Sequence, residues 1–164
     1  MKVRFVTSQG NIILELYPEK APNTVGNFLG YVKSGHYNGT IFHRVIEEFM
    51  IQGGGLDSSM KTKSAGIPIK NEANNGLKNE LGTIAMARTS DPHSATTQFF
   101  INTTDNVFLD FRSETEDGWG YCVFGRVIDG MEVVRLIEET DTTTREGYMD
   151  VPVEIILIEK AELI

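Results

Sequence analysis

The sequence predicts a mainly β protein, an antiparallel barrel or sandwich with helices over its open ends. Short apolar runs recur along the chain between polar, glycine-bearing turns, which is typical of strands. Two stretches have the apolar spacing of a helix, and they do not alternate regularly with the strands as in a βαβ protein. Strands that close on themselves or pack in two layers, with helices covering the open ends, fit this pattern.

The first element expected is a hairpin. Val3 and Phe5 alternate with polar neighbours, residues 8–11 are turn-like, and Ile12 and Leu14 resume the alternation. A meander of antiparallel strands therefore begins at the start of the chain.

A helix is expected over residues 23–34, between Pro22 and Gly35, which suit its two ends. Its apolar residues fall at i, i+3, i+4 and i+7: Val25, Phe28, Leu29 and Val32. A second helix is expected over residues 131–138, where Asp129 and Glu132 have the spacing of a capping box. Its apolar stripe consists of Val133, Leu136 and Ile137.

The other strands are expected in six apolar runs. These are IFHRVI (41–46), FMIQ (49–52), TIAMA (83–87), QFFIN (98–102), YCVFGRVI (121–128) and VEIILIEKA (153–161). Two polar, irregular stretches, residues 57–78 and 103–118, are long enough to do more than connect strands.

Length and charge limit the possible functions. A chain of 164 residues without linker or repeat fits one domain, residues 1–164. The net charge of -8 disfavours nucleic acid as a partner. The single cysteine, Cys122, excludes a disulfide framework and lies in an apolar run that predicts burial. Neither a signal peptide nor a membrane-spanning stretch is evident, so we expect a cytoplasmic protein that does not bind membranes.

Chemically capable residues are densest in FHRVIEEFMIQGGG, residues 42–55. Strand alternation places Phe42 and Arg44 on one face and His43 on the other, and it places Met50 on the side of Gln52. A second cluster combines AMART (85–89) with Gln98 and Phe100, which share a face, and a third is Phe108, Leu109 and Asp110. Each segment alone also fits ordinary core packing.

Other chemistries find less support. The glycine run 53–55 lacks the lysine and the serine or threonine of a phosphate-binding loop. His36, His43 and His93 have no metal-like spacing, and no nucleophile elbow supports a hydrolase built on Ser94 and His43. We expect neither a metal nor a cofactor.

Several motifs in order resemble the cyclophilin family of peptidyl-prolyl cis/trans isomerases along nearly the whole chain. They are FHRVIEEFMIQGGG, NGLKNELGTIAMAR, QFFIN, FLD and VFGRV. The runs GWGYCVFG and IKNEANNGLKN are similar to the bacterial cytoplasmic branch. The resemblance implies a closed eight-stranded antiparallel β-barrel capped by two α-helices. It also implies an isomerase that acts on X-Pro bonds and assists protein folding.

The resemblance assigns roles residue by residue. Arg44 corresponds to the essential arginine, Phe49 belongs to the catalytic pocket, and Gln52 lies beside Arg44. The implied substrate-binding residues are Met50, Ala87, Arg88, Gln98, Phe100, Phe108, Leu109 and Tyr121.

Three of these positions depart from common members of the family. Phe108 replaces a tryptophan, Tyr121 a histidine and Arg88 an asparagine. Because phenylalanine has no indole N–H, we expect weakened binding of cyclosporin.

The partners expected are proline-containing peptides and folding proteins, and the chain is expected to be a monomer, since no heptad repeat offers an interface. Two alternatives stay open: a non-catalytic proline-peptide-binding module, with or without a chaperone role, and a scaffold whose apolar residues all serve the core. Arg44 argues against the first, because a binding module has no evident need of a donor aimed at the prolyl nitrogen.

Overall fold

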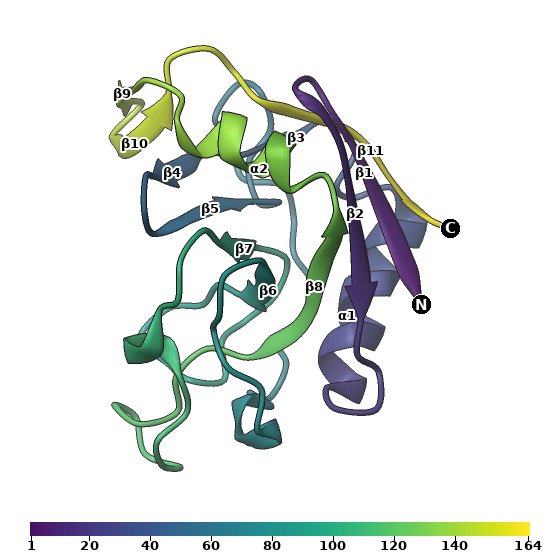
Figure 1. Ribbon diagram of the computed structural model, residues 1–164, viewed down its shortest axis with the longest axis vertical. Coiled ribbons are helices and arrows are strands. Elements are labelled where there is room, and N and C mark those ends of the chain that lie inside the picture. The colour runs from purple at the N-terminus through teal and green to yellow at the C-terminus, as the bar shows by residue number, and fades with distance from the viewer.

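The computed structural model describes all 164 residues as one strongly curled antiparallel sheet with two α-helices (Figure 1). Its strands are β1 (Lys2–Thr7), β2 (Gly10–Leu16), β3 (Thr40–Ile41), β4 (Arg44–Ile46), β5 (Met50–Gly53), β6 (Thr83–Met86), β7 (Phe99–Asn102), β8 (Val123–Asp129) and β11 (Leu157–Leu163). Their order in the sheet is β3-β11-β1-β2-β8-β6-β7-β5-β4. The predicted mainly β, barrel-like fold is confirmed.

The strand count differs slightly from the predicted eight. β3 and β4 form the two ends of the nine-stranded sheet and are separated in the chain only by Phe42 and His43. The sheet therefore curls round until its first and last strands belong to one short segment of chain. Counting β3 and β4 as one interrupted strand gives the eight that the resemblance implied.

The interruption also corrects one prediction of side-chain direction. Strand alternation placed Phe42 on the face of Arg44, whereas Phe42 is fully buried in the barrel core and Arg44 is exposed. The alternation fails because Phe42 and His43 lie outside both strands, so the period of two is interrupted between β3 and β4. Gly53 permits this path, since a Cβ there would lie 2.6 Å from the Ile41 carbonyl oxygen.

The first helix, α1 (Pro22–Ser34), confirms its prediction. Val25, Phe28, Leu29 and Val32 are all buried. Gly35 ends the helix in the left-handed conformation at φ 77°, and its N–H reaches back to the Tyr31 and Val32 carbonyls.

The second helix, α2 (Met131–Glu138), has the predicted bounds but not the predicted cap. Gly130 is the N-cap residue, with φ 93° and no side-chain hydrogen bond, so the capping box is wrong. Leu136 is also exposed, and Val134 is buried in its place. Neither helix is long and apolar enough to cross a membrane.

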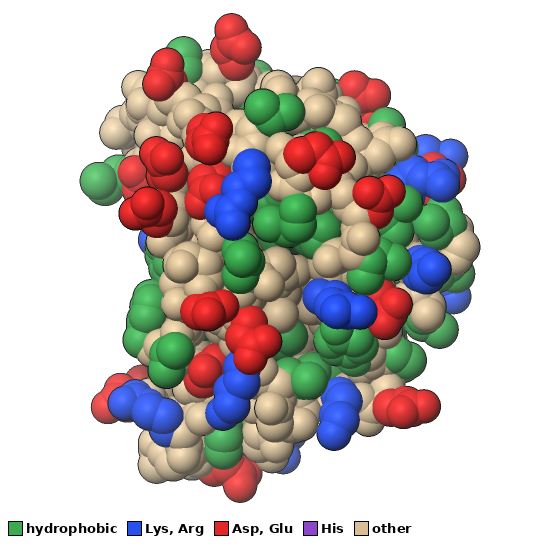
Figure 2. Space-filling model, viewed as in Figure 1, with side chains coloured by type: hydrophobic (Ala, Val, Ile, Leu, Met, Phe, Trp, Pro, Cys, Tyr) green, Lys and Arg blue, Asp and Glu red, His purple; other side chains and the backbone are tan.

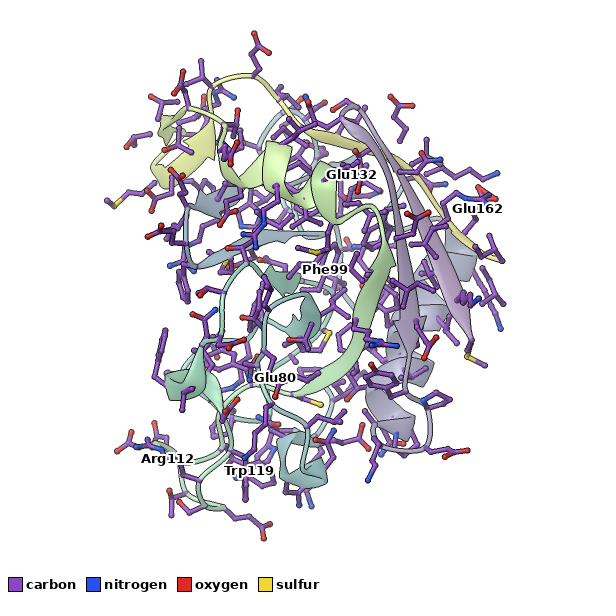
Figure 3. The ribbon with its side chains drawn as sticks, in the orientation of Figure 1. Glu80, Phe99, Arg112, Trp119, Glu132 and Glu162 are labelled. Atoms are coloured by element: carbon purple, nitrogen blue, oxygen red, sulfur yellow. The ribbon has the colours of Figure 1, made fainter.

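The inside of the barrel is packed with apolar side chains. One cluster of 29 buried residues draws on α1, α2 and most strands. Phe99 stands near its centre (Figure 3). Its ring meets those of Phe5, Phe28 and Tyr37 at centroid distances of 5.2, 6.0 and 5.6 Å. Because side chains fill the interior, it is a core and not a ligand cavity. Cys122 is buried as predicted.

A second, two-stranded sheet was not predicted. It pairs β9 (Thr142–Arg145) with β10 (Tyr148–Pro152) beside β4. β9 reads TTTR and is largely exposed, so no apolar alternation marks it in the sequence. The predicted final strand, in turn, begins later than expected, at Leu157. The polar stretches hold two short 3-10 helices, η1 (Ala73–Asn75) and η2 (Val107–Leu109).

Candidate active site

The candidate site is built on a row of side chains that crosses the outer face of four strands. In the register of the sheet, Arg44 on β4 lies opposite Gln52 on β5, Gln52 opposite Phe100 on β7, and Phe100 opposite Ala85 on β6. Since facing residues project to the same side of a sheet, the pairing alone brings a cation, an amide and an aromatic ring together. Their flanking neighbours, such as Ile51 and Ile101, fill the barrel core.

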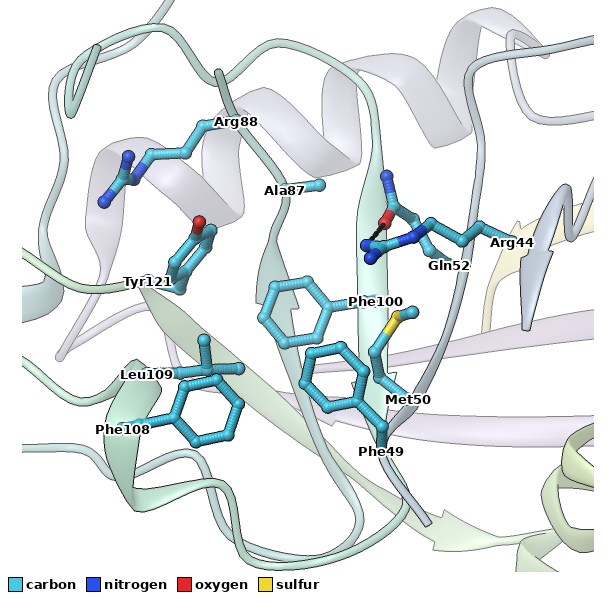
Figure 4. A pocket seen from close by; sticks show the side chains of 10 residues that line it. All are labelled: Arg44, Phe49, Met50, Gln52, Ala87, Arg88, Phe100, Phe108, Leu109 and Tyr121. Carbon is cyan, nitrogen blue, oxygen red and sulfur yellow. Dashed lines mark hydrogen bonds between the residues drawn. The ribbon is translucent and has the colours of Figure 1, made fainter. Parts of the chain in front are cut away.

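A pocket of about 280 Å³ opens over this row, and we call it the main pocket (Figure 4). It is lined by Arg44, Phe49, Met50, Gln52, Ala87, Arg88, Phe100, Phe108, Leu109 and Tyr121. Every site residue expected from the sequence except Gln98 belongs to this lining. Gln98 lies in an adjoining hollow of about 170 Å³, the side pocket, lined by Gln52, Ala87, Arg88, Thr89, Ser94, Thr96 and Gln98.

Arg44 stands at the edge of the main pocket with most of its guanidinium free. Its Nη1 donates to the Gln52 Oε1 at 3.2 Å, and the Gln52 Nε2 donates in turn to the Gln98 Oε1 at 2.9 Å. The guanidinium carbon lies 6.0 Å from the centre of the Phe49 ring, and no carboxylate is paired with it. Arg44 is thus oriented by a neutral chain of amides and keeps its positive charge and unused N–H groups for a ligand.

The floor and walls of the main pocket are apolar and come from separate segments. Met50, Phe100 and Leu109 are buried, at 2%, 4% and 9% exposure. Phe49 stacks on Phe108 with ring centroids 5.7 Å apart. Phe108 is 70% exposed, so it forms a rim rather than a floor. A small apolar ring entering this space would be held on several sides.

Arg88 closes the opposite side of the pocket. Its guanidinium lies over the Tyr121 ring, 4.3 Å from the ring centre, and donates to the Gly120 carbonyl from Nε at 3.1 Å and from Nη2 at 2.9 Å. Gly120 must be glycine there. Its φ is 67°, and a Cβ would lie 2.5 Å from the Leu109 carbonyl oxygen.

Behind the walls lies a buried network of asparagine amides that sequence reasoning missed. The Asn106 Nδ2 donates to the Phe49 carbonyl at 2.9 Å and to the Asn102 Oδ1 at 2.8 Å. The Asn102 Nδ2 donates to the Asn79 Oδ1 at 3.1 Å, and the Asn79 Nδ2 donates to the Leu109 and Tyr121 carbonyls at 3.1 and 3.2 Å. The only signal in the sequence was Asn102 itself, a polar residue within an apolar strand.

The two other chemistries considered are a metal site and a Ser-His hydrolase. No group of three or more histidine, cysteine, aspartate and glutamate side chains is placed to hold a metal ion. The His43 ring packs against Tyr148, whereas the Ser94 hydroxyl donates to the Asp91 carbonyl, so no Ser-His pair forms. Burial, and secondly the charge of Arg44, lower the pKa of His43 to about 4, which keeps this ring neutral at pH 7.

This fold is that of a prolyl isomerase family. The chain belongs to the cyclophilin-type peptidyl-prolyl cis-trans isomerases, whose family model matches residues 2–163. It is 57% identical over 162 residues to a peptidyl-prolyl cis-trans isomerase of Streptomyces antibioticus, covering 99% of this chain and 98% of that protein. It is also 57% identical to peptidyl-prolyl cis-trans isomerase B of Escherichia coli K12, covering 96% of each. The predicted family is confirmed.

A solved structure agrees with the fold. The crystal structure of a cyclophilin-type isomerase from Cryptosporidium parvum, obtained in the presence of the dipeptide Ala-Pro, matches with a TM-score of 0.81 at 28% identity. The match covers 98% of this chain and 97% of that one.

Proposed function

We propose that this chain is a peptidyl-prolyl cis-trans isomerase in which Arg44 stabilises the twisted X-Pro bond over the main pocket. Family membership and two relatives named as such isomerases at 57% identity support the activity. The observation that carries the role of Arg44 is its guanidinium, free of any carboxylate and aimed by Gln52 at the edge of an apolar pocket. Proline-containing peptides are the ligands of this pocket.

The reaction needs a hydrogen-bond donor at the prolyl nitrogen. Rotation about an X-Pro bond is opposed by amide resonance, with a barrier of roughly 20 kcal/mol. At the twisted state the nitrogen loses conjugation and regains a lone pair that accepts a hydrogen bond. A bond from Arg44 to this nitrogen is therefore stronger in the transition state than in the planar ground state, which is the condition for raising the rate.

The apolar walls contribute by holding the ring. Phe49, Met50, Phe100 and Leu109 surround the space beside Arg44 and exclude water that would favour the planar, more polar amide. With the ring fixed, the carbonyl of the preceding residue turns. A charge-assisted hydrogen bond contributes about 1.5–3 kcal/mol, and orientation supplies the rest of the about 4–8 kcal/mol needed for a 10³- to 10⁶-fold acceleration. No covalent bond breaks, so this mechanism requires neither metal nor cofactor.

The proposal extends to partners and place of action. Residues 1–164 act as one domain, a monomer that binds folding proteins at X-Pro bonds without contacting nucleic acid or membranes. The net charge of -8 supports the absence of nucleic acid, and Figure 2 shows acidic and basic side chains interspersed over the viewed face without a continuous basic patch there. The cytoplasm is the proposed place of action, and the unpaired, buried Cys122 requires no oxidising compartment.

The test is the cis-to-trans rate of a short Ala-Pro peptide, measured by exchange NMR. Arg44→Ala should lower kcat/KM about 100-fold, the equivalent of about 3 kcal/mol, while the fold survives because Arg44 is exposed. Arg44→Lys should recover only part of this loss, because it keeps the charge but not the planar fork. Arg4→Gln, which removes an equal charge on β1 from a partly exposed ion pair, is the control and should stay at wild-type rate.

Two outcomes would count against the proposal. Full activity in folded Arg44→Ala would remove Arg44 from the mechanism. A wild-type chain that binds the peptide without accelerating its rotation would point to the non-catalytic binding module.

A further inference from the structure

Both arginines of the main pocket carry charges that the protein leaves unpaired. The chain has 23 acidic residues against 15 lysines and arginines, yet none of the acidic residues lines the main pocket or the side pocket. The ion pairs of the structure, Arg4–Glu162, Arg135–Glu138 and Lys160–Glu162, all lie elsewhere. The main pocket and the side pocket together form a groove, and this groove is therefore a locally positive site on an acidic protein.

Arg88 is the arginine that the proposed chemistry does not use. Figure 4 shows Arg44 and Arg88 on opposite sides of Phe100. Arg88 is half-buried and fixed by the Tyr121 ring, the Gly120 carbonyl and the Thr89 carbonyl, to which its Nη1 donates at 2.9 Å. These contacts use three of the five guanidinium N–H groups and leave two without a partner. All the oxygens that hold Arg88 are backbone carbonyls, so no acidic group neutralises its charge.

The backbone beside Arg88 is open as well. β6 ends at Met86, and the Arg88 N–H makes no backbone hydrogen bond, although the Ala87 N–H is bonded to Gln98. Ala87 and Arg88 border both the main pocket and the side pocket. A peptide whose proline ring fills the main pocket and whose chain continues into the side pocket therefore runs past Ala87 and Arg88.

We propose that Arg88 is a specificity residue that favours substrates with an acidic side chain immediately before the proline. This inference rests on the isomerase function proposed above. A Glu or Asp at that position would lie beside the two unused N–H groups of Arg88, and Arg44 adds a second positive charge across the pocket. A basic residue at the same position would be repelled by both.

A separate group of carboxylates limits this preference to one position. Asp91, Glu114 and Glu116 line a separate open hollow together with His93 and Trp119. None of the three forms an ion pair with Arg88. An acidic peptide residue that reached this hollow would meet charges of its own sign, so it should gain nothing.

The test compares acetylated tetrapeptides that differ only in the residue before proline, which is Glu, Gln or Lys. The ratio of kcat/KM for Glu-Pro over Gln-Pro, each corrected for its uncatalysed rate, should be about threefold for the wild type, as expected of one partly exposed ion pair. It should fall toward one in Arg88→Gln, where only the charge of Arg44 remains, and in concentrated salt, which screens exposed charges. Arg88→Glu should instead favour Lys-Pro. Arg4→Gln removes the same charge far from the groove and should keep the wild-type ratio.

The ratio separates this proposal from the isomerase function. An equal rate for Glu-Pro and Gln-Pro, a preference that is undiminished in Arg88→Gln, or a preference that follows a Glu placed after the proline would each overturn the role of Arg88 while leaving the isomerase intact. Absence of acceleration for all three peptides would overturn the proposed function itself.

Discussion

The side chain of Asn106 joins the interior of the protein to the wall of the main pocket. It is 3% exposed, and its Nδ2 donates both to the Phe49 carbonyl and to the Asn102 Oδ1. Phe49 lies in the turn between β4 and β5, immediately before Met50, and its ring stacks on Phe108. Asn106→Ala removes both hydrogen bonds without removing any atom of the pocket lining.

The loss of stability depends on the hydrogen bonds that the two acceptor oxygens retain in Asn106→Ala. The Phe49 carbonyl still accepts from the Thr103 N–H at 3.0 Å, so its loss costs about 1 kcal/mol. The Asn102 Oδ1 has no second donor and is left buried and unpaired, at a cost of about 1–2 kcal/mol. The free energy of unfolding should therefore fall by about 2–3 kcal/mol, which lowers Tm by about 5 to 10 °C in a chain of this size.

Two measurements check this reasoning. Urea unfolding gives the stability loss, and exchange NMR on an Ala-Pro peptide should show a KM raised a few-fold, with a smaller change in kcat, because the turn that carries Phe49 is less firmly held. Asn11→Ala is the control: Asn11 is exposed and its side chain makes no hydrogen bond, so its stability should change by less than about 0.5 kcal/mol. Wild-type stability in Asn106→Ala would refute the energetic reasoning. A stability loss with unchanged kinetics would refute the positioning of Phe49.

Three further outcomes are expected. Because the pKa of His43 is lowered from 6.5 to about 4, the unfolded chain takes up a proton in this range and the folded one does not. The free energy of unfolding should therefore fall by on the order of 3 kcal/mol between about pH 6.5 and pH 4, and His43→Leu should abolish this part of the pH dependence. The pKa of Cys122 is raised to about 11, chiefly by burial, so a thiol reagent should modify it only after unfolding; rapid labelling of the native protein would contradict this. Phe108→Trp should tighten cyclosporin binding, and a calorimetric titration with unchanged affinity would overturn that expectation.

Periodicity predicted the elements whose burial is one-sided. The hairpin β1–β2 and the helices α1 and α2 were found because one face of each packs on the core and the other meets solvent. β9 was not predicted, because both of its faces are largely exposed. The break between β3 and β4 was not predicted, because IFHRVI has the pattern of one continuous strand. The run is interrupted by its tertiary contacts, since β3 pairs with β11 whereas β4 pairs with β5.

The site could be predicted to the level of residue types and their order. Arg44 and Gln52 were expected side by side, and the register of β4 and β5 with the hydrogen bond between the two side chains confirms that neighbourhood. Gln98 was expected in the same groove and lies in the adjoining side pocket, bonded to Gln52. The catalytic and binding roles of these residues stay predictions, because proximity shows what can meet a ligand and not what each contact contributes to the rate.

The asparagine network shows why the residues that support the pocket walls could not be predicted from the sequence. The pocket walls near Phe49, Leu109 and Tyr121 belong to three segments, and in each the backbone carbonyl, not the side chain, accepts from a buried amide. Asn79 supplies two of these contacts and Asn106 the third, with Asn102 joining the two. An asparagine has the same composition and hydropathy in a loop as in such a network, so no periodic pattern distinguishes the two. The spacing of the walls is thus set by residues that carry no chemical signal of the site, while Arg44, which carries the clearest signal, needs only one hydrogen bond to hold it.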